Sequence, residues 1–263
     1  MGLYDRDYYR TPQRGGVGSV RMWSITTWLI IINVTVFVVD VVMRSIQTAQ
    51  AQEMEPWRPV RVDSALFEWG YFSIAEGIRG GQAWRFISYA FLHFDPWHLL
   101  MNMVGLWLFG PVVELNLGVR RYVFFYFLCV VAGPAMYTLL WGLGLVVPGG
   151  PSQLLIHSMQ VPMIGASAAV FGVLLGAAHL SPDRPINVYF MEVPLKYLAW
   201  FMVGLAAFGV LTHSNNAGGE AAHLGGALAG FVLIRQEAVL DIVLPKRVVR
   251  GRRVKDWSRD MNR

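Results

Sequence analysis

The chain has 263 residues, of which 55% are hydrophobic and only 15% are charged, and its formal net charge is +5. A mean hydropathy of +0.43 excludes an ordinary soluble domain of this size, because such domains carry more charge and fewer apolar residues. Between Arg121 and Asp183 there is no Asp, Glu, Lys or Arg, and this stretch is long enough for two membrane spans and a connection. The composition therefore predicts a multi-pass membrane protein.

Hydropathy along the chain predicts six helices that cross the bilayer. Because a backbone in lipid must satisfy its own hydrogen bonds, and these segments are too long and uniformly apolar for barrel strands, we expect an all-α, six-helix bundle. Residues 44–94 form a long outer loop rich in aromatic residues, which predicts an interfacial element lying partly in the membrane. The expected helices are residues 23–43, 95–114, 121–143, 166–181, 195–212 and 220–240.

Lys and Arg are unevenly distributed among the short connections, and this distribution predicts the orientation. They occur before the first helix and in the connections that follow the second and fourth helices, and they are absent from those that follow the third and fifth. The positive-inside rule then places both termini in the cytoplasm, and we expect the plasma membrane. The predicted organisation is one membrane domain, residues 23–240, between cytoplasmic tails of residues 1–22 and 241–263.

The C-terminal tail is strongly basic and has two interpretations, an arm that binds nucleic acid or a cytoplasmic segment beside anionic lipid. We expect the lipid bilayer to be its partner and no nucleic acid, because basic tails next to a last span commonly lie against anionic lipid. Its cations are Lys246, Arg247, Arg250, Arg252, Arg253, Lys255, Arg259 and Arg263.

Four polar side chains lie near the beginnings of the second, fourth and sixth predicted helices. These three helices run from the outer to the inner surface, so their first turns lie at a similar depth. His98 and Asn102 share one face of the second helix, whereas Ser167 and His223 begin the fourth and sixth. Polar groups in a membrane tend to face a bundle interior or a wet cavity, which predicts one shared site. The alternative is a hydrogen-bond network that only holds the helices together.

Small residues recur at intervals of four in the fourth and sixth predicted helices. Such stripes let two helices approach closely, and they usually serve packing alone. Here they adjoin Ser167 and His223, so close approach would bring these side chains together. The stripes are Ala168, Gly172 and Gly176 in the fourth helix, and Ala222, Gly226 and Gly230 in the sixth.

A serine and a histidine in contact suggest nucleophilic catalysis. A serine hydroxyl is a weak nucleophile until a base takes its proton, and a desolvated imidazole favours the neutral form that a base requires. We therefore expect Ser167 to be the nucleophile and His223 the general base. The backbone N–H of Ser167 and the side chains of His98 and Asn102 are the candidate donors for an oxyanion.

Five segments resemble the motifs of the rhomboid family of intramembrane serine proteases, and they occur in the family's order. The resemblance covers roughly residues 67–231, and it assigns Ser167 and His223 as the catalytic pair and His98 and Asn102 as oxyanion donors. The segments are Trp84-Arg85, His93-Phe-Asp-Pro-Trp-His98-Leu-Leu-Met-Asn102, Gly110-Pro-Val-Val-Glu114-Leu-Asn-Leu-Gly118, Gly165-Ala-Ser167-Ala and Ala222-His223-Leu-Gly-Gly226.

The resemblance carries further expectations. Substrates would be transmembrane proteins cleaved near their outer ends, at small residues in helices that unwind easily. The second and fifth helices would form a lateral gate, and the catalytic cavity would be capped by the loop before the fourth helix and by residues 213–220. Phe171 is expected to pack against His223. Ala168 stands where the family usually has Gly, so its methyl group is expected beside the oxyanion site or in the helix contact.

We expect neither a metal nor a cofactor. Cys129 is the single cysteine, which excludes an intramolecular disulfide and a thiolate-rich metal site. His157 and His213 are expected in outer loops and His179 near the inner end of the fourth helix, so these histidines do not form a metal site. Arg85 and Glu114 are interpreted as structural anchors.

The predicted function is intramembrane serine endopeptidase activity through an acyl-enzyme. One alternative is a non-catalytic rhomboid-like protein that binds membrane clients, although such a protein has no need to keep both Ser167 and His223. A small transporter is a third interpretation, but it would require an intramembrane carboxylate. Asp40, Glu114 and Glu220 are the nearest candidates, and all are expected near the ends of helices.

Overall fold

The computed structural model describes most of the expected membrane domain. The described residues are 23–55, 57, 62–146, 159–188, 190–212, 214, 216–236 and 239–240, without the side chains of residues 144–146. The predictions for the tails, residues 1–22 and 241–263, and for His157 and His213 lie outside these residues.

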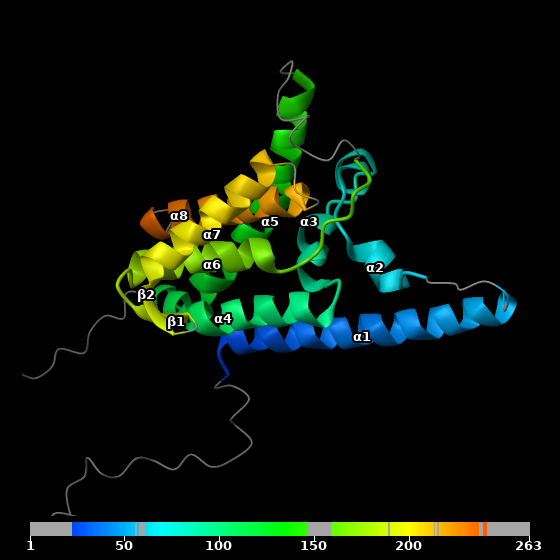
Figure 1. Cartoon of the computed structure of the whole chain (residues 1–263), viewed down its shortest axis with the longest axis horizontal. Coiled ribbons are helices and arrows are strands. Elements are labelled where there is room, and N and C mark those ends of the chain that lie inside the picture. Colours follow the sequence, from blue (N-terminus) through cyan, green and yellow to red (C-terminus); the bar gives the residue numbers. More distant parts are fainter. Residues whose placement is uncertain are drawn as a thin grey trace, which may run out of the picture.

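The structure is a helical bundle, and the six predicted helices correspond to α1, α4, α5, α6, α7 and α8 (Figure 1). Of these, α1, α4, α5 and α8 are long and apolar enough to cross a membrane, whereas α6 and α7 are shorter, with 14 and 17 residues. The all-α membrane bundle is thus confirmed. The elements are α1 (Ile25–Met54), α2 (Ala65–Gly70), the π-helical turn η3 (Ile74–Arg79), α3 (Arg85–Ser88), the 3-10 turn η4 (Tyr89–Phe91), α4 (Pro96–Leu117), α5 (Val119–Val146), α6 (Ser167–Leu180), β1 (Pro185–Val188), β2 (Met191–Pro194), α7 (Leu195–Leu211) and α8 (Ala217–Arg235).

Helix α1 continues to Met54, so the first part of the expected outer loop is helical and not loop. The prediction ended this helix at residue 43, where the apolar run ends. The residues that follow include Ala, Gln and Glu, which are good helix formers, and no Gly or Pro interrupts them. Arg44 also donates to Asp40 one turn earlier at 2.6 Å. The helix therefore extends well past α4 (Figure 1).

A short antiparallel hairpin, β1–β2, connects α6 to α7, where the sequence predicted only a loop. Pro185 pairs with Pro194 and Ile186 with Val193. The alternation over so few residues is too short to be distinguished from a loop by sequence. The hairpin joins the C-terminal end of α6 to α7, whereas Ser167 lies at the opposite end of that helix.

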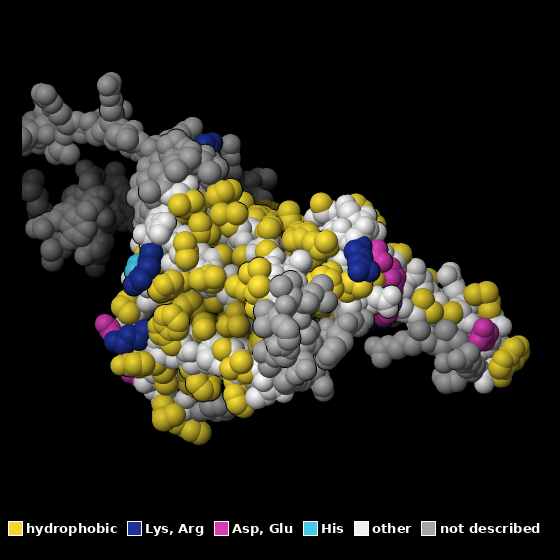
Figure 2. All heavy atoms as spheres, turned by 90° about the horizontal axis from the view of Figure 1, so that it is seen from above, with side chains coloured by type: hydrophobic (Ala, Val, Ile, Leu, Met, Phe, Trp, Pro, Cys, Tyr) yellow, Lys and Arg dark blue, Asp and Glu magenta, His cyan; other side chains and the backbone are white. Residues whose placement is uncertain are grey.

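Helix α6 lies at the centre of the bundle, in contact with α4, α5, α7 and α8. Most of its residues are buried, as expected for a helix that is apolar on every side. The outer faces of the surrounding helices are apolar as well. Figure 2 shows a face covered mainly by hydrophobic side chains, with charged ones at its edges. On α7 the exposed large hydrophobic residues are Tyr197, Trp200, Phe201, Leu205, Phe208 and Leu211.

Glu114 anchors the beginning of α1 to the end of α4. Its carboxylate accepts hydrogen bonds from the backbone N–H groups of Ile25 and Thr26, at 2.7 and 3.0 Å, and from the Thr26 hydroxyl at 2.7 Å. The first N–H groups of a helix have no acceptor within the helix, and a carboxylate there is favourable. The interpretation of Glu114 as a structural anchor agrees with these contacts.

Arg85 holds the segment between α1 and α4 together. Its guanidinium donates to the carbonyl oxygens of Tyr71 and Glu68, at 2.5 and 2.8 Å, and to the side chain of Gln82 at 2.6 Å. The side chain is 5% exposed, and it also lies over the Tyr71 ring. The forked arrangement of donors lets one arginine satisfy several carbonyl groups. Arg85 is therefore a structural anchor as well.

Candidate active site

The segment before Ser167 is held by backbone hydrogen bonds to the region between α1 and α4. Phe72 and Met163 exchange two bonds, at 3.0 and 2.7 Å, and the N–H of Gly165 donates to the carbonyl of Tyr89 at 2.9 Å. The expected interfacial loop thus contributes directly to the site. It sets the path of the chain that enters α6.

Gly165 adopts a backbone conformation that L side chains rarely adopt, with φ of +117°. A Cβ atom at this position would also lie 2.6 Å from Nε2 of His98. Both the conformation and the space therefore require glycine two residues before Ser167. This close approach places the His98 ring against the backbone that leads to Ser167.

Ser167 and His223 are in hydrogen-bonding contact, with 2.8 Å between Oγ and Nε2. Ser167 is the first residue of α6, and its N-cap residue makes no side-chain cap bond. The N–H groups of a first helical turn have no acceptor within the helix. The backbone N–H of Ser167 is therefore suitably placed to bind a developing negative charge beside its own hydroxyl.

The contact between α6 and α8 is close enough for these two side chains to meet. A Cβ atom at Gly226 would collide with the Ala168 carbonyl, and one at Gly230 would collide with the Gly172 carbonyl. These four residues belong to the two stripes that the sequence singled out. Helix backbones can approach in this way only where the interface lacks larger side chains.

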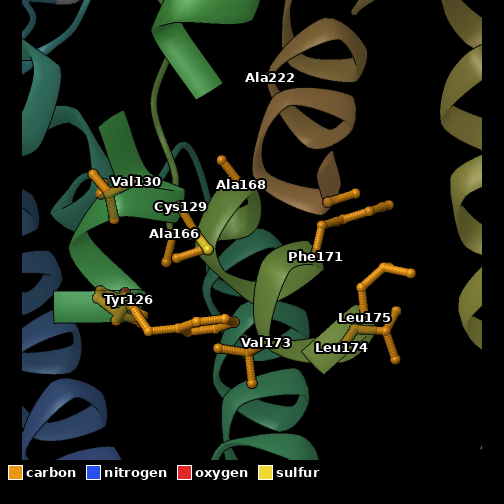
Figure 3. Close-up of a cluster of buried hydrophobic side chains, with 14 of the residues drawn as sticks. Tyr126, Cys129, Val130, Ala166, Ala168, Phe171, Val173, Leu174, Leu175 and Ala222 are labelled. Carbon is orange, nitrogen blue, oxygen red and sulfur yellow. The ribbon is translucent and has the colours of Figure 1, made fainter. Parts of the chain in front are cut away.

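Phe171, one turn after Ser167, stacks on the imidazole of His223. The ring centroids are 4.4 Å apart and the rings are nearly parallel, at 6°. Figure 3 shows Phe171 extending from α6 towards α8. The stacked ring leaves the two imidazole nitrogens free to bond in the ring plane, so it restricts the orientation of His223 without competing for them.

Ala168 points away from the site. It does not line the cavity that contains Ser167, and it is 1% exposed. Figure 3 shows it at the beginning of α6 near α8. A Cβ atom on Gly133 of α5 would lie 2.8 Å from the Ala168 methyl group and 3.3 Å from that of Ala222 on α8, so the Ala168 methyl group packs at this helix contact. Of the two expected positions for this methyl group, the structure supports the helix contact and not the oxyanion site.

His98 and Asn102 lie on one face of α4 and line the same cavity as Ser167 and His223. The Asn102 amide donates one hydrogen bond to the His98 carbonyl at 2.8 Å. An amide group carries two N–H donors, so this bond leaves one for a ligand. All four residues singled out by the sequence therefore reach one site.

The cavity has a volume of about 630 Å³ and is mainly apolar. A volume of this size is typical of ligand sites, and a mainly apolar wall with a few convergent polar groups is also typical. The lining comes from α4, α5, α6, α7 and α8 together with the segment before Ser167. It includes Met101, Tyr137, Met163, Val170, Met202, Asn216 and Gly218.

A contact between Glu220 and His223 was not predicted from the sequence. Oε2 of Glu220 lies 3.0 Å from Nδ1 of His223, the imidazole nitrogen that does not face Ser167. From the sequence, Glu220 was interpreted only as a carboxylate near the end of a helix. The spacing of three residues from His223 was the available signal, because residues i and i+3 share a helix face.

His93 is buried next to His98 and is not among the residues that line the cavity of Ser167 and His223. Its ring centroid is 5.0 Å from that of His98, in an edge-to-face arrangement. Burial, and then the neighbouring His98, lowers the pKa of His93 from its ordinary 6.5 to about 3. His93 is therefore neutral at physiological pH. Within the described ranges, no three His, Cys, Asp or Glu side chains are grouped so that they could hold a metal ion.

Comparison with known proteins identifies the family. A family model described as "Rhomboid domain" matches residues 80–236. The mitochondrial RHOMBOID-like protein 12 of Arabidopsis thaliana is 28% identical over 170 residues, which cover 64% of this chain and 50% of that protein. The mitochondrial Rhomboid protein 1 of Saccharomyces cerevisiae is 34% identical over 152 residues, 55% of this chain and 39% of that protein. Rhomboid protease GlpG of Klebsiella pneumoniae is 25% identical over 156 residues, which cover 58% of this chain and 48% of that protein.

The chain spans about half the length, or less, of these three curated relatives. The family model nevertheless covers more than half of this chain, and the matched range contains Ser167, His223, His98 and Asn102. The helical membrane bundle agrees with this match. The chain therefore belongs to the rhomboid family.

Proposed function

We propose that this protein is an intramembrane serine endopeptidase in which Ser167 is the nucleophile and His223 the general base. The observation that carries the proposal is the 2.8 Å contact between Ser167 Oγ and His223 Nε2. This contact lies in a cavity that is also lined by the two candidate oxyanion donors, His98 and Asn102. A nucleophile, a base and donors around one space are the parts that acyl transfer requires.

In the proposed reaction, Ser167 Oγ attacks the carbonyl carbon of the scissile peptide bond while its proton passes to Nε2 of His223. The carbonyl electron pair moves onto oxygen, and the backbone N–H of Ser167 with His98 and Asn102 stabilises that charge. The C–N bond then breaks, and the leaving amine takes the proton from Nε2. Water attacks the acyl-enzyme by the same route and releases the carboxylate product and Ser167.

The substrates we propose are transmembrane segments, cleaved near the membrane surface on the side where the cavity lies. The rhomboid names of the relatives and the apolar cavity wall support this substrate class. A peptide bond in a regular helix has its carbonyl bonded within the helix, so a segment that unwinds easily would present that carbonyl more readily. The proposed entrance for such a segment lies between α4 and α7.

We also propose that both termini lie on the cytoplasmic side, opposite to the cavity. The distribution of Lys and Arg supports this orientation. The mitochondrial relatives do not support the expected plasma membrane, so we propose no compartment. In sealed vesicles of known orientation, a membrane-impermeant maleimide should label Ser19→Cys and Ser258→Cys only from the cytoplasmic side. Labelling of either residue from the other side would overturn the orientation.

A non-catalytic protein that binds membrane clients is the second candidate function. The same apolar cavity would suit a client helix, and catalysis is then the property that separates the two candidates. Client binding alone does not require a serine and a histidine in hydrogen-bonding contact. We therefore favour the peptidase.

The test compares purified wild-type protein with Ser167→Ala and His223→Ala, using model single-span substrates in liposomes. We expect each variant to lose at least about 1,000-fold in cleavage rate, since the nucleophile and base act as a unit. Ser45→Ala, on the exposed side of α1, and His179→Ala, at the other end of α6, are the matched controls. Wild-type cleavage by both Ser167→Ala and His223→Ala, or no cleavage of any substrate by wild type, would overturn the proposal.

A further inference from the structure

Glu220 and His223 both lie in the first two turns of α8, and their side chains meet on the side of the imidazole away from Ser167. The distances from the imidazole are 3.0 Å to Glu220 Oε2 and 2.8 Å to Ser167 Oγ. The three groups therefore form a continuous chain, from carboxylate to imidazole to hydroxyl. Such an arrangement allows the first group to influence how the second acts on the third.

The carboxylate determines which tautomer His223 adopts. An ionised carboxylate can only accept hydrogen bonds, so Nδ1 must donate its N–H to Glu220. Nε2 of a neutral imidazole then carries the lone pair, and this lone pair faces Ser167 Oγ. That tautomer is the one that can take a proton from the hydroxyl.

The surroundings hold the Glu220 carboxylate in place. Asn216 lies 3.5 Å from its other oxygen, and the absence of a side chain at Gly209 of α7 makes room for it, since a Cβ atom there would lie 2.8 Å from Glu220 Cγ. The side chains of Glu220 and His223 are 23% and 15% exposed. A charge in such a partly buried position acts more strongly on its neighbour than one in open water.

We infer that Glu220 is a positioning residue that completes a Ser167–His223–Glu220 triad by orienting His223 and stabilising its protonated form. This inference rests on the proposed peptidase activity. During attack the Ser167 proton moves to Nε2, and the imidazolium that forms lies beside the carboxylate, which stays ionised. The positive charge on His223 develops only as the proton is transferred. The Glu220 carboxylate therefore stabilises the transition state more than the ground state, and this difference increases the rate.

A purely structural role predicts a different result. Glu220 lies in the first turn of α8, where a carboxylate stabilises a helix regardless of catalysis. Loss of that effect would lower the melting temperature and leave the turnover of the folded enzyme unchanged. The two roles therefore separate when stability and turnover are measured on the same variants.

The experiment compares wild type with Glu220→Gln and Glu220→Asp for kcat, KM and thermal stability. We expect Glu220→Gln to lower kcat by roughly 10- to 100-fold with little change in KM. This loss is smaller than the roughly 10,000-fold effect in a serine protease whose triad carboxylate is fully buried. Glu220→Asp keeps the charge and should retain more activity than Glu220→Gln. Glu192→Gln, which removes an exposed carboxylate from the β1–β2 hairpin, is the matched control.

The outcomes separate this inference from the proposed function. A Glu220→Gln enzyme with wild-type kcat would overturn the triad, while inactivity of Ser167→Ala in the same assay would leave the peptidase standing. A melting temperature that falls without a change in kcat would assign Glu220 to helix stability alone and overturn the triad as well. Wild-type activity in Ser167→Ala would instead overturn the peptidase itself.

Discussion

Helix α8 meets α6 through backbone atoms and small side chains, whereas the beginning of α1 is also held to α4 by hydrogen bonds to the carboxylate of Glu114. At the first contact, Gly226 leaves no room for even one methyl group against the Ala168 carbonyl. At the second, polar bonds hold the helices, as they also do where Asp40 of α1 accepts from Ser64 beside α2. Both close packing and polar bonds can hold helices together in lipid, where the hydrophobic effect provides little force between helices.

The difference follows from what each contact must position. The proposed proton transfer between Ser167 and His223 requires two side chains on separate helices to stay within hydrogen-bonding distance. Only closely packed backbones allow this, and dense packing keeps the distance constant. The α1–α4 contact holds neither of the two proposed catalytic residues, and Glu114 accepts three hydrogen bonds there from the beginning of α1. The molecule thus combines a closely packed contact between α6 and α8 with a contact between α1 and α4 that is held by polar bonds.

The largest expected effect breaks the α6–α8 contact. Gly226→Val would force the two helices apart, and we expect the cleavage rate to fall by about 100-fold or more, since a displacement of about 1 Å can cost that much. The matched control is Gly204→Val on α7, where a Cβ atom would meet nothing within 4 Å. The rate is measured in liposomes on the folded fraction of each protein. Equal rates for Gly226→Val and wild type would show that close packing is not needed for the site.

The second prediction disrupts the contact between α1 and α4 and leaves the contact between α6 and α8 intact. Glu114→Gln loses the charge and one acceptor, which leaves an N–H or hydroxyl at the beginning of α1 without a partner. We expect the free energy of unfolding to fall by about 1.5–3 kcal/mol, the usual value for hydrogen bonds to a charged group. Unfolding in detergent measures this, with Glu192→Gln as control. Turnover of the folded protein should stay within about threefold of wild type. A larger loss would show that the contact between α1 and α4 also affects the site of Ser167 and His223.

A third prediction concerns His93, which is buried next to His98. Its pKa is about 3 in the folded protein, against an ordinary value of 6.5, so the unfolded chain takes up the proton first as the pH falls. The free energy of unfolding is therefore unaffected by His93 titration above about pH 6.5. It falls progressively as the pH is lowered from about 6.5 to about 3, with a slope of at most about 1.4 kcal/mol per pH unit. His93→Gln should reduce the loss of melting temperature between about pH 7 and pH 5. An identical loss in both proteins would contradict the assignment.

The smallest expected effect sharpens the boundary between packing and chemistry. Ala168→Gly removes a methyl group that packs between α5 and α8 and does not line the cavity. We expect stability to fall by about 1 kcal/mol, from the lower helix propensity of glycine, with activity within about twofold of wild type. Melting and cleavage are measured on the same preparation. A tenfold gain in activity would show instead that the methyl group crowds the oxyanion site.

The amino-acid sequence by itself predicted the helical membrane bundle and singled out four residues that line one cavity. Six apolar segments predict six helices, because hydropathy is a local property, and the spacing of His98 and Asn102 places them on one face. The short helices between α1 and α4 were less predictable, because aromatic and polar residues without a clear period do not distinguish a helix from a loop. The continuation of α1 to Met54 was missed for a related reason, since polarity marks a membrane boundary and not the end of a helix.

Only the tertiary structure decided how these residues meet. The positive φ of Gly165, the position of the Ala168 methyl group and the contact of Glu220 with His223 depend on helices that are distant in sequence. A stripe of small residues indicates that helices can approach, but the rotation of each helix about its axis decides which side chains face each other. That rotation is set by packing throughout the bundle, so it cannot be obtained from any one segment.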